Sequence, residues 1–175
     1  MTEMRPHLLL AAALLALCAI AGCRDAGGEG RYFELSGHLF SFNYRISTAV
    51  YIITLNPVRP MEEGQTVVAT LENPAGGEPI VVRQKVWPKL SHVTVESPPL
   101  QCVVKDRPYA VSLVVEDASG KALQTIETTV TSTLDQSVLP DRPLVLGSVY
   151  ERNPELGPDG RLIGGKPKAD ACPKS

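Results

Sequence analysis

The chain of 175 residues has few of the residue types on which most catalytic and nucleic-acid sites depend. It contains three histidines and one tryptophan, and its net charge of −2 lacks the basic excess of a nucleic-acid binder. The sequence has no His-x-x-x-His, Cys-x-x-Cys or Gly-x-Ser-x-Gly spacing and no acidic loop with a glycine at calcium-site spacing. We therefore expect no catalytic residues, no metal site, no cofactor and no nucleic-acid partner.

Long hydrophobic runs are also scarce, and the one that is present lies at the amino terminus. Residues 8–20 carry no charge over about 13 positions, which suits the apolar part of a signal peptide and is too short for a membrane-spanning helix. The run leads into Ile20-Ala21-Gly22-Cys23. We expect residues 1–22 to be a cleaved signal peptide and the mature chain to be soluble apart from its amino terminus.

The segment Ile20-Ala21-Gly22-Cys23 resembles the lipobox of bacterial lipoproteins, in which an aliphatic and two small residues precede the lipidated cysteine. The resemblance implies that Cys23 becomes the first mature residue and carries two or three acyl chains, enough for stable anchoring in a bilayer. Arg24 follows, in place of the Asp that tends to hold enteric lipoproteins at the inner membrane, which favours the outer membrane. The alternative is ordinary secretion, because Ala19-Ile20-Ala21 also fits a cleavage site that would release a protein beginning at Gly22.

Two of the four cysteines remain after these assignments. Cys18 leaves with the signal peptide and Cys23 takes the lipid, so Cys102 and Cys172 are left in a compartment that favours disulfides. A bridge would close a loop of about 70 residues and stabilise the fold by ~4 kcal/mol in the chain-entropy model. The alternative is two unpaired cysteines, one packed near a strand and one on a loose tail.

The remaining composition favours an all-β domain, because Val and Thr dominate the middle of the chain and prolines and glycines are frequent. Strand patterns cover residues 32–37, 38–47, 48–56, 65–72, 79–86, 91–96, 109–115, 121–133 and 144–150. Gly37 is expected to form a bulge or bend. Residues 48–56 are more continuously apolar, which predicts a central strand buried on both faces.

The clearest local signal is a hairpin at residues 109–121. Apolar residues alternate along its first arm, and Asp117-Ala118-Ser119-Gly120 forms the turn. The hairpin resembles the closing hairpin of many immunoglobulin-like periplasmic and surface domains. The second arm also has apolar residues at helical spacing, but its many β-branched residues favour a strand. We predict an immunoglobulin-like two-sheet β-sandwich of about seven or eight strands, with a small β-barrel as the alternative.

The domain boundaries follow from composition. Residues 23–30 are predicted to be the lipidated cysteine and a flexible Gly-rich tether, and residues 31–150 the sandwich. Residues 151–175 are rich in Pro, Gly and Lys, which predicts a mostly disordered tail.

The remaining histidines and acidic residues do not form a catalytic group by their spacing in the sequence. His38 and His92 are interpreted as surface strand residues, and a distant site that combines them with Met61 is the weaker hypothesis. The pair at 62–63 and Asp141 are interpreted as solvated loop charges.

Trp87 has two interpretations. It lies between Lys85 and Lys89, so it could be an exposed contact residue. A partly buried position in the core or at its rim is favoured.

The leading hypothesis is a non-enzymatic envelope lipoprotein that binds or scaffolds another component. Its partners would be the lipid bilayer, through acylated Cys23, and an unidentified envelope protein that contacts the sheet edges or the loops at 56–66, 73–79 and 97–107. The first alternative is a small-ligand or metal carrier with a pocket inside the fold. The second is an envelope hydrolase in which the histidines or several carboxylates converge.

Overall fold

The computed structural model describes residues 30–165 and Cys172. The predicted signal peptide, Cys23 with the tether up to residue 29, and residues 166–171 and 173–175 of the tail lie outside the described residues. Tyr32–Ser175 form one compact unit, distinct from Met1–Arg31. Within the described part of the chain, no helix has the length and apolar character needed to cross a bilayer.

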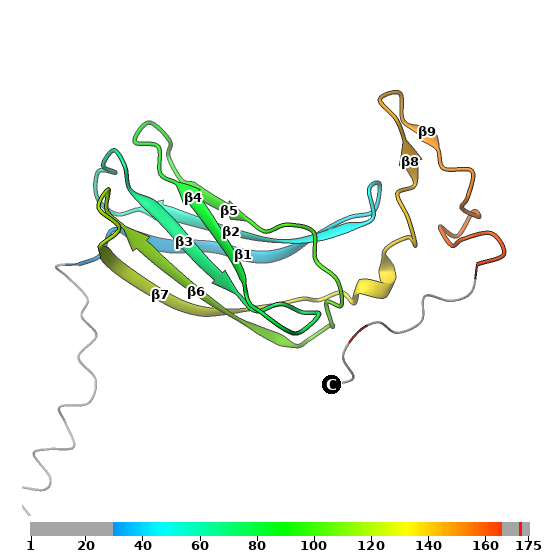
Figure 1. Cartoon of the computed structure of the whole chain (residues 1–175), viewed down its shortest axis with the longest axis horizontal. Coiled ribbons are helices and arrows are strands. Elements are labelled where there is room, and N and C mark those ends of the chain that lie inside the picture. Colours follow the sequence, from blue (N-terminus) through cyan, green and yellow to red (C-terminus); the bar gives the residue numbers. More distant parts are fainter. Residues whose placement is uncertain (1–29, 166–171, 173–175) are drawn as a thin grey trace, which may run out of the picture. The chain divides into compact units, whose positions relative to one another are not determined.

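Two antiparallel sheets pack face to face in this unit (Figure 1). The strands are β1 (Phe33–Asn43), β2 (Thr48–Pro57), β3 (Thr66–Leu71), β4 (Ile80–Lys85), β5 (Val93–Glu96), β6 (Pro108–Glu116) and β7 (Ala122–Thr131). One sheet has the order β1-β2-β5 and the other β4-β3-β6-β7. The predicted all-β, immunoglobulin-like sandwich is confirmed. The barrel alternative is wrong, because the sheets do not close on each other.

The chain crosses between the sheets after β2, after β4 and after β5. Immunoglobulin constant domains place the fourth strand in the sheet of the first two. Here β4 instead pairs with β3, from Thr66 opposite Lys85 to Leu71 opposite Ile80, so the sheets have three and four strands. The strands predicted at 79–86 and 91–96 therefore lie in different sheets, which their local sequence patterns do not reveal.

The core lies between the sheets and is filled by alternate residues of each strand. On β3 the three residues predicted to point inward, Val67, Ala69 and Leu71, are fully buried. On β2 burial alternates along the strand, so the prediction of burial on both faces is wrong. The strand is central in its sheet, and on its outer face Val50 and Ile52 remain half-buried.

β1 joins two segments that were predicted as separate strands. Its pairing with β2 shifts register between Leu35 and Gly37, which is the bulge expected at this glycine. The strand ends at Asn43, earlier than predicted, and Tyr44 and Ile46 lie exposed in the turn to β2.

β7 is a strand, as its β-branched residues predicted, and its edge is joined to that of β1 by one side chain. The Gln124 amide oxygen accepts the backbone N–H groups of Tyr32 and Phe33 at 2.7 and 2.9 Å, and the amide nitrogen donates to the Phe33 carbonyl at 2.8 Å. The Gln124 side chain thus bridges the edges of β1 and β7, for which the structure shows no backbone pairing among the described residues.

The sandwich has two ends. We call the end where β1 begins the entry end; it carries the β2–β3 loop, the β4–β5 loop and the 117–121 turn. We call the opposite end the far end; it carries the 44–47 turn, the 72–79 loop and the 97–107 loop.

The segment that follows β7 packs at the far end. It contains a short 3₁₀ turn, Gln136–Val138, and a small hairpin of β8 (Val145–Leu146) and β9 (Glu151–Arg152). The Leu144 N–H donates to the Arg45 carbonyl at 2.8 Å, which attaches this segment to the β1–β2 turn. The strand predicted at 144–150 therefore exists only over two residues.

The prediction of a disordered tail is wrong for residues 151–165. Asn153 and Leu156 are buried there, although the segment has few apolar residues. The Asn153 side chain donates to the Pro143 carbonyl at 2.9 Å and accepts the Glu155 N–H at 3.0 Å. Hydrogen bonds from a polar side chain to the backbone thus order a segment that its composition predicts to be disordered.

Candidate interaction surfaces

The two histidines do not converge. His38 is exposed on β1, and His92 is exposed just before β5, with its Nδ1 3.0 Å from the Ser91 hydroxyl. These strands flank β2 on opposite sides, so the weaker hypothesis that combines both histidines with Met61 is wrong. In residues 30–165 and at Cys172, no group of three His, Cys, Asp or Glu side chains could hold a metal ion.

The loop carboxylates separate into two kinds. Glu62 and Glu63 are exposed, as predicted. Asp141 is not a solvated charge: one oxygen accepts from Arg161 at 3.0 Å and the other accepts the Leu162 N–H at 2.9 Å. Arg161 also donates to the carbonyls of Leu139 and Ser137, at 3.2 and 2.7 Å. Arg161 and Asp141 therefore connect the 155–165 region to the segment after β7.

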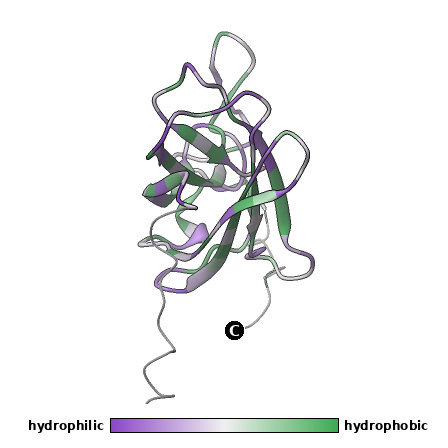
Figure 2. Cartoon of the chain, turned by 90° about the vertical axis from the view of Figure 1, so that its left-hand side faces the viewer, coloured by the Kyte–Doolittle hydropathy of each residue, from purple (hydrophilic) through white to green (hydrophobic). Residues whose placement is uncertain are grey.

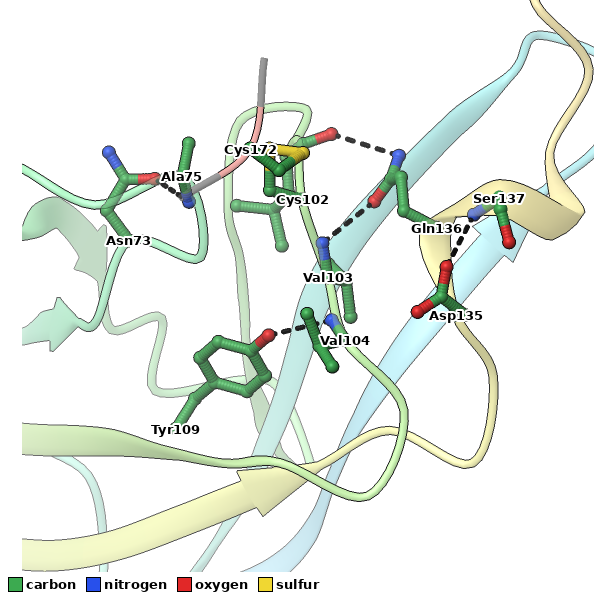
Figure 3. The surroundings of a disulfide bond; sticks show 11 residues. Asn73, Ala75, Cys102, Val103, Val104, Tyr109, Asp135, Gln136, Ser137 and Cys172 are labelled. Atoms are coloured by element: carbon green, nitrogen blue, oxygen red, sulfur yellow. Dashed lines mark hydrogen bonds between the residues drawn. A yellow bond between two sulfur atoms is a disulfide. The ribbon is translucent and has the colours of Figure 1, made fainter. Parts of the chain in front are cut away.

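Cys102 and Cys172 form a disulfide at the far end, with 5.3 Å between their Cα atoms (Figure 3). Cys102 is buried and has a left-handed φ of 67°. The Gln136 backbone N–H donates to the Val103 carbonyl at 2.8 Å, and its side chain lies between Val103 and Leu100. The 97–107 loop, which was a candidate binding loop, is thus held in place by these contacts.

Tyr109 closes the same loop. It lies at the start of β6, fully buried, and its hydroxyl accepts the Val104 N–H at 2.8 Å (Figure 3). A tyrosine that bonds to the backbone a few residues upstream at this strand is the tyrosine corner of immunoglobulin-like domains. The Arg107 guanidinium lies 4.7 Å from the ring centroid and pairs with Glu72 at 2.6 Å. The alternating pattern identified Tyr109 only as a strand residue.

The titratable groups with shifted pKa values have structural partners. Burial raises the pKa of Tyr51, with a further contribution from Glu72, and its hydroxyl donates to the Glu72 carbonyl at 2.9 Å. The Ser119 hydroxyl and the Lys121 and Ser119 N–H groups lower the pKa of Asp117 in the β6–β7 turn. The Ser137 N–H and hydroxyl lower the pKa of Asp135, which caps the 3₁₀ turn. Each shift follows from the local structure.

The β8–β9 hairpin exposes apolar side chains at the far end. Leu146, Val149 and Tyr150 are 44%, 74% and 61% exposed. The Arg45 guanidinium lies 4.4 Å from the centroid of the Tyr150 ring. Single exposed apolar residues are common on protein surfaces, but these three lie together on one small hairpin.

A shallow depression of about 450 Å³ lies beside this hairpin. Its lining is Leu144, Val145, Arg152, Asn153, Leu156, Gly157 and Pro158. The buried side chain of Asn153 already bonds within the protein, so the depression offers few free polar groups to a solute.

Trp87 lies at the entry end and is 52% exposed, so the favoured interpretation of it as a core or rim residue is wrong. Its neighbour Val86 fills the core in its place and is fully buried. The Lys85 ammonium lies 4.4 Å from the centroid of the indole ring. Both of the sandwich's ends therefore present apolar side chains to the surroundings.

Comparison with protein-family models found no match for this chain, and a search of curated proteins found none either.

Proposed function

We propose that this protein is a lipid-anchored, non-enzymatic binding or scaffolding module of the bacterial cell envelope, with the outer membrane favoured. The observation that carries the proposal is a short separation along the chain. The lipobox-like segment ends at Cys23, and the compact unit begins at Tyr32. About nine residues span at most ~30 Å when fully extended, so acyl chains on Cys23 would hold the sandwich next to a bilayer.

The disulfide supports export. Disulfides persist in oxidising compartments such as the periplasm and are rare in the cytosol. Cys102 is buried and bonded to Cys172, as suits a structural bridge. This agrees with the signal peptide and with an envelope location.

The β8–β9 hairpin is the surface that we propose for a protein partner. It belongs to the far end, so a chain anchored near the entry end leaves it accessible. Val149 and Tyr150 supply the exposed apolar and aromatic area that interface centres use. A carrier function is less well supported, because side chains fill the space between the sheets and the depression beside the hairpin is shallow.

Two measurements test the proposal. Mass spectrometry of the amino-terminal peptide from envelope-purified protein should find Cys23 carrying a diacylglycerol. A mature chain that begins at Gly22 without fatty acid would overturn the anchor.

A photo-crosslinking amino acid at position 149 should capture the same envelope protein in repeated experiments. The matched control is the same probe at Thr129, which is exposed on β7. Equal capture from both positions, or no reproducible product from position 149, would argue against this surface.

A further inference from the structure

We infer that the entry end is a membrane-facing surface, and that the turn at residues 85–90 contacts anionic lipid headgroups. We call these residues the Trp87 turn. The inference rests on the proposed anchor at Cys23 and adds the orientation of the sandwich on the bilayer.

The Trp87 turn is built to display its apolar side chains. The Leu90 N–H donates to the Trp87 carbonyl at 3.0 Å, and Pro88 occupies the second position of this four-residue turn, where its fixed φ is favourable. The buried residue Val86 fixes the base, because its N–H donates to the Gln65 carbonyl at 2.9 Å. Trp87 and Leu90 are left 52% and 53% exposed.

Two lysines accompany the exposed indole. Lys85 lies over the ring, and Lys89 is exposed within the turn itself. Among the described residues neither forms a salt bridge. An indole at headgroup depth beside exposed ammonium groups is the combination that anionic bilayer surfaces attract.

The acidic pair Glu62 and Glu63 lies in the neighbouring β2–β3 loop and is exposed. These carboxylates would be repelled by anionic lipid. The contact is therefore confined to the Trp87 turn and supplements the acyl anchor.

The chain enters the compact unit at this same end. Phe33 pairs with Pro57, the last residue of β2, and the Val58 N–H donates to the Tyr32 carbonyl at 2.9 Å. Thr66, at the start of β3, pairs with Lys85 at the base of the Trp87 turn. The entry end faces the viewer in Figure 2.

The length of the strands favours an orientation in which the entry end, and not the far end, faces the bilayer. The ten residues of β2 rise ~33 Å, at about 3.3 Å per residue. The far end therefore lies about one strand length farther than the entry end from the point where the chain enters the compact unit. A tether of at most ~30 Å brings the Trp87 turn to the bilayer more readily than the β8–β9 hairpin.

The test uses Trp87 as its own reporter, because it is the single tryptophan of the chain. The mature protein, purified from envelopes, is reconstituted into phosphatidylglycerol–phosphatidylcholine vesicles that carry a spin label near the headgroup. We expect Trp87 emission to shift to shorter wavelength and to lose intensity. A spin label at the end of the acyl chain should quench it less.

Leu90→Glu and Lys89→Glu should each reduce the loss of emission. The matched control is Leu39→Glu, because Leu39 is 51% exposed but lies in the middle of β1, and it should leave the quenching unchanged. Pure phosphatidylcholine vesicles should also give less quenching, and equal quenching in them would contradict the role of the lysines.

The mass of the amino-terminal peptide, measured on the same sample, separates the two proposals. An acylated protein whose Trp87 is not quenched would overturn the orientation and leave the anchor standing. An unacylated protein would overturn the anchor, and with it the orientation.

Discussion

The tyrosine corner can be tested by removing one oxygen atom with Tyr109→Phe. The ring would keep its packing, because Phe40 lies edge-on with its centroid at 5.3 Å and Arg107 lies over the face. Only the hydrogen bond from the Val104 N–H, at 2.8 Å, would be lost. Any change in stability therefore reports on this bond.

The expected cost follows from the position of Val104. A net hydrogen bond contributes about 0.5–1.5 kcal/mol, and leaving a buried donor unpaired costs about 1–3 kcal/mol. Val104 is half-buried, so water can reach its N–H only in part. We expect the free energy of unfolding to fall by about 2 kcal/mol.

Urea unfolding followed by circular dichroism measures this difference. With a denaturant slope of about 2 kcal/mol/M, the midpoint should fall by about 1 M while the slope stays unchanged. Tyr44→Phe is the control, because Tyr44 is exposed in the β1–β2 turn and its change should stay within about 0.5 kcal/mol. Equal midpoints for the two variants would refute the assigned role of the Tyr109 hydroxyl.

Replacing Cys102 and Cys172 by serine should lower the free energy of unfolding by about 4 kcal/mol, the chain-entropy value for a bridge with a sequence separation of 70; two free thiols in the denatured, unreduced wild type would contradict the bridge. Gln124→Ala removes three hydrogen bonds between the edges of β1 and β7 and should cost about 2 kcal/mol in a urea titration, whereas an unchanged midpoint would show that water replaces the amide. Asp117→Asn should destabilise at neutral pH, because hydrogen bonds from Ser119 lower the pKa of the Asp117 carboxyl and so stabilise the fold above the unfolded-state pKa. That contribution is lost as the pH falls through the lowered pKa, so the urea midpoints of variant and wild type should converge in the acid range, below the ordinary pKa of an aspartate, and a difference independent of pH would exclude the carboxylate as its source.

Local sequence determined the strands, because alternation with a period of two is a property of neighbouring residues. Val67, Ala69 and Leu71 point inward as their spacing required, and the Asp117–Gly120 turn closes the hairpin that its composition predicted. Gly37 marks the bulge in β1. The sandwich class therefore follows from patterns within single strands and the turns that join them.

Tertiary structure decided which residues lie at surfaces and which hold the fold together. The hydrogen bond between Gln124 and Tyr32 and the one between Arg161 and Asp141 join positions 92 and 20 residues apart, and no local pattern encodes such pairs. Trp87 is exposed because its neighbour Val86 takes the place in the core, and the alternation of that strand cannot say which of the two sheets it joins. Periodicity determines which face of a strand is buried, but the partner of each strand, and so the exposed ends of the sandwich, depends on packing across the whole chain.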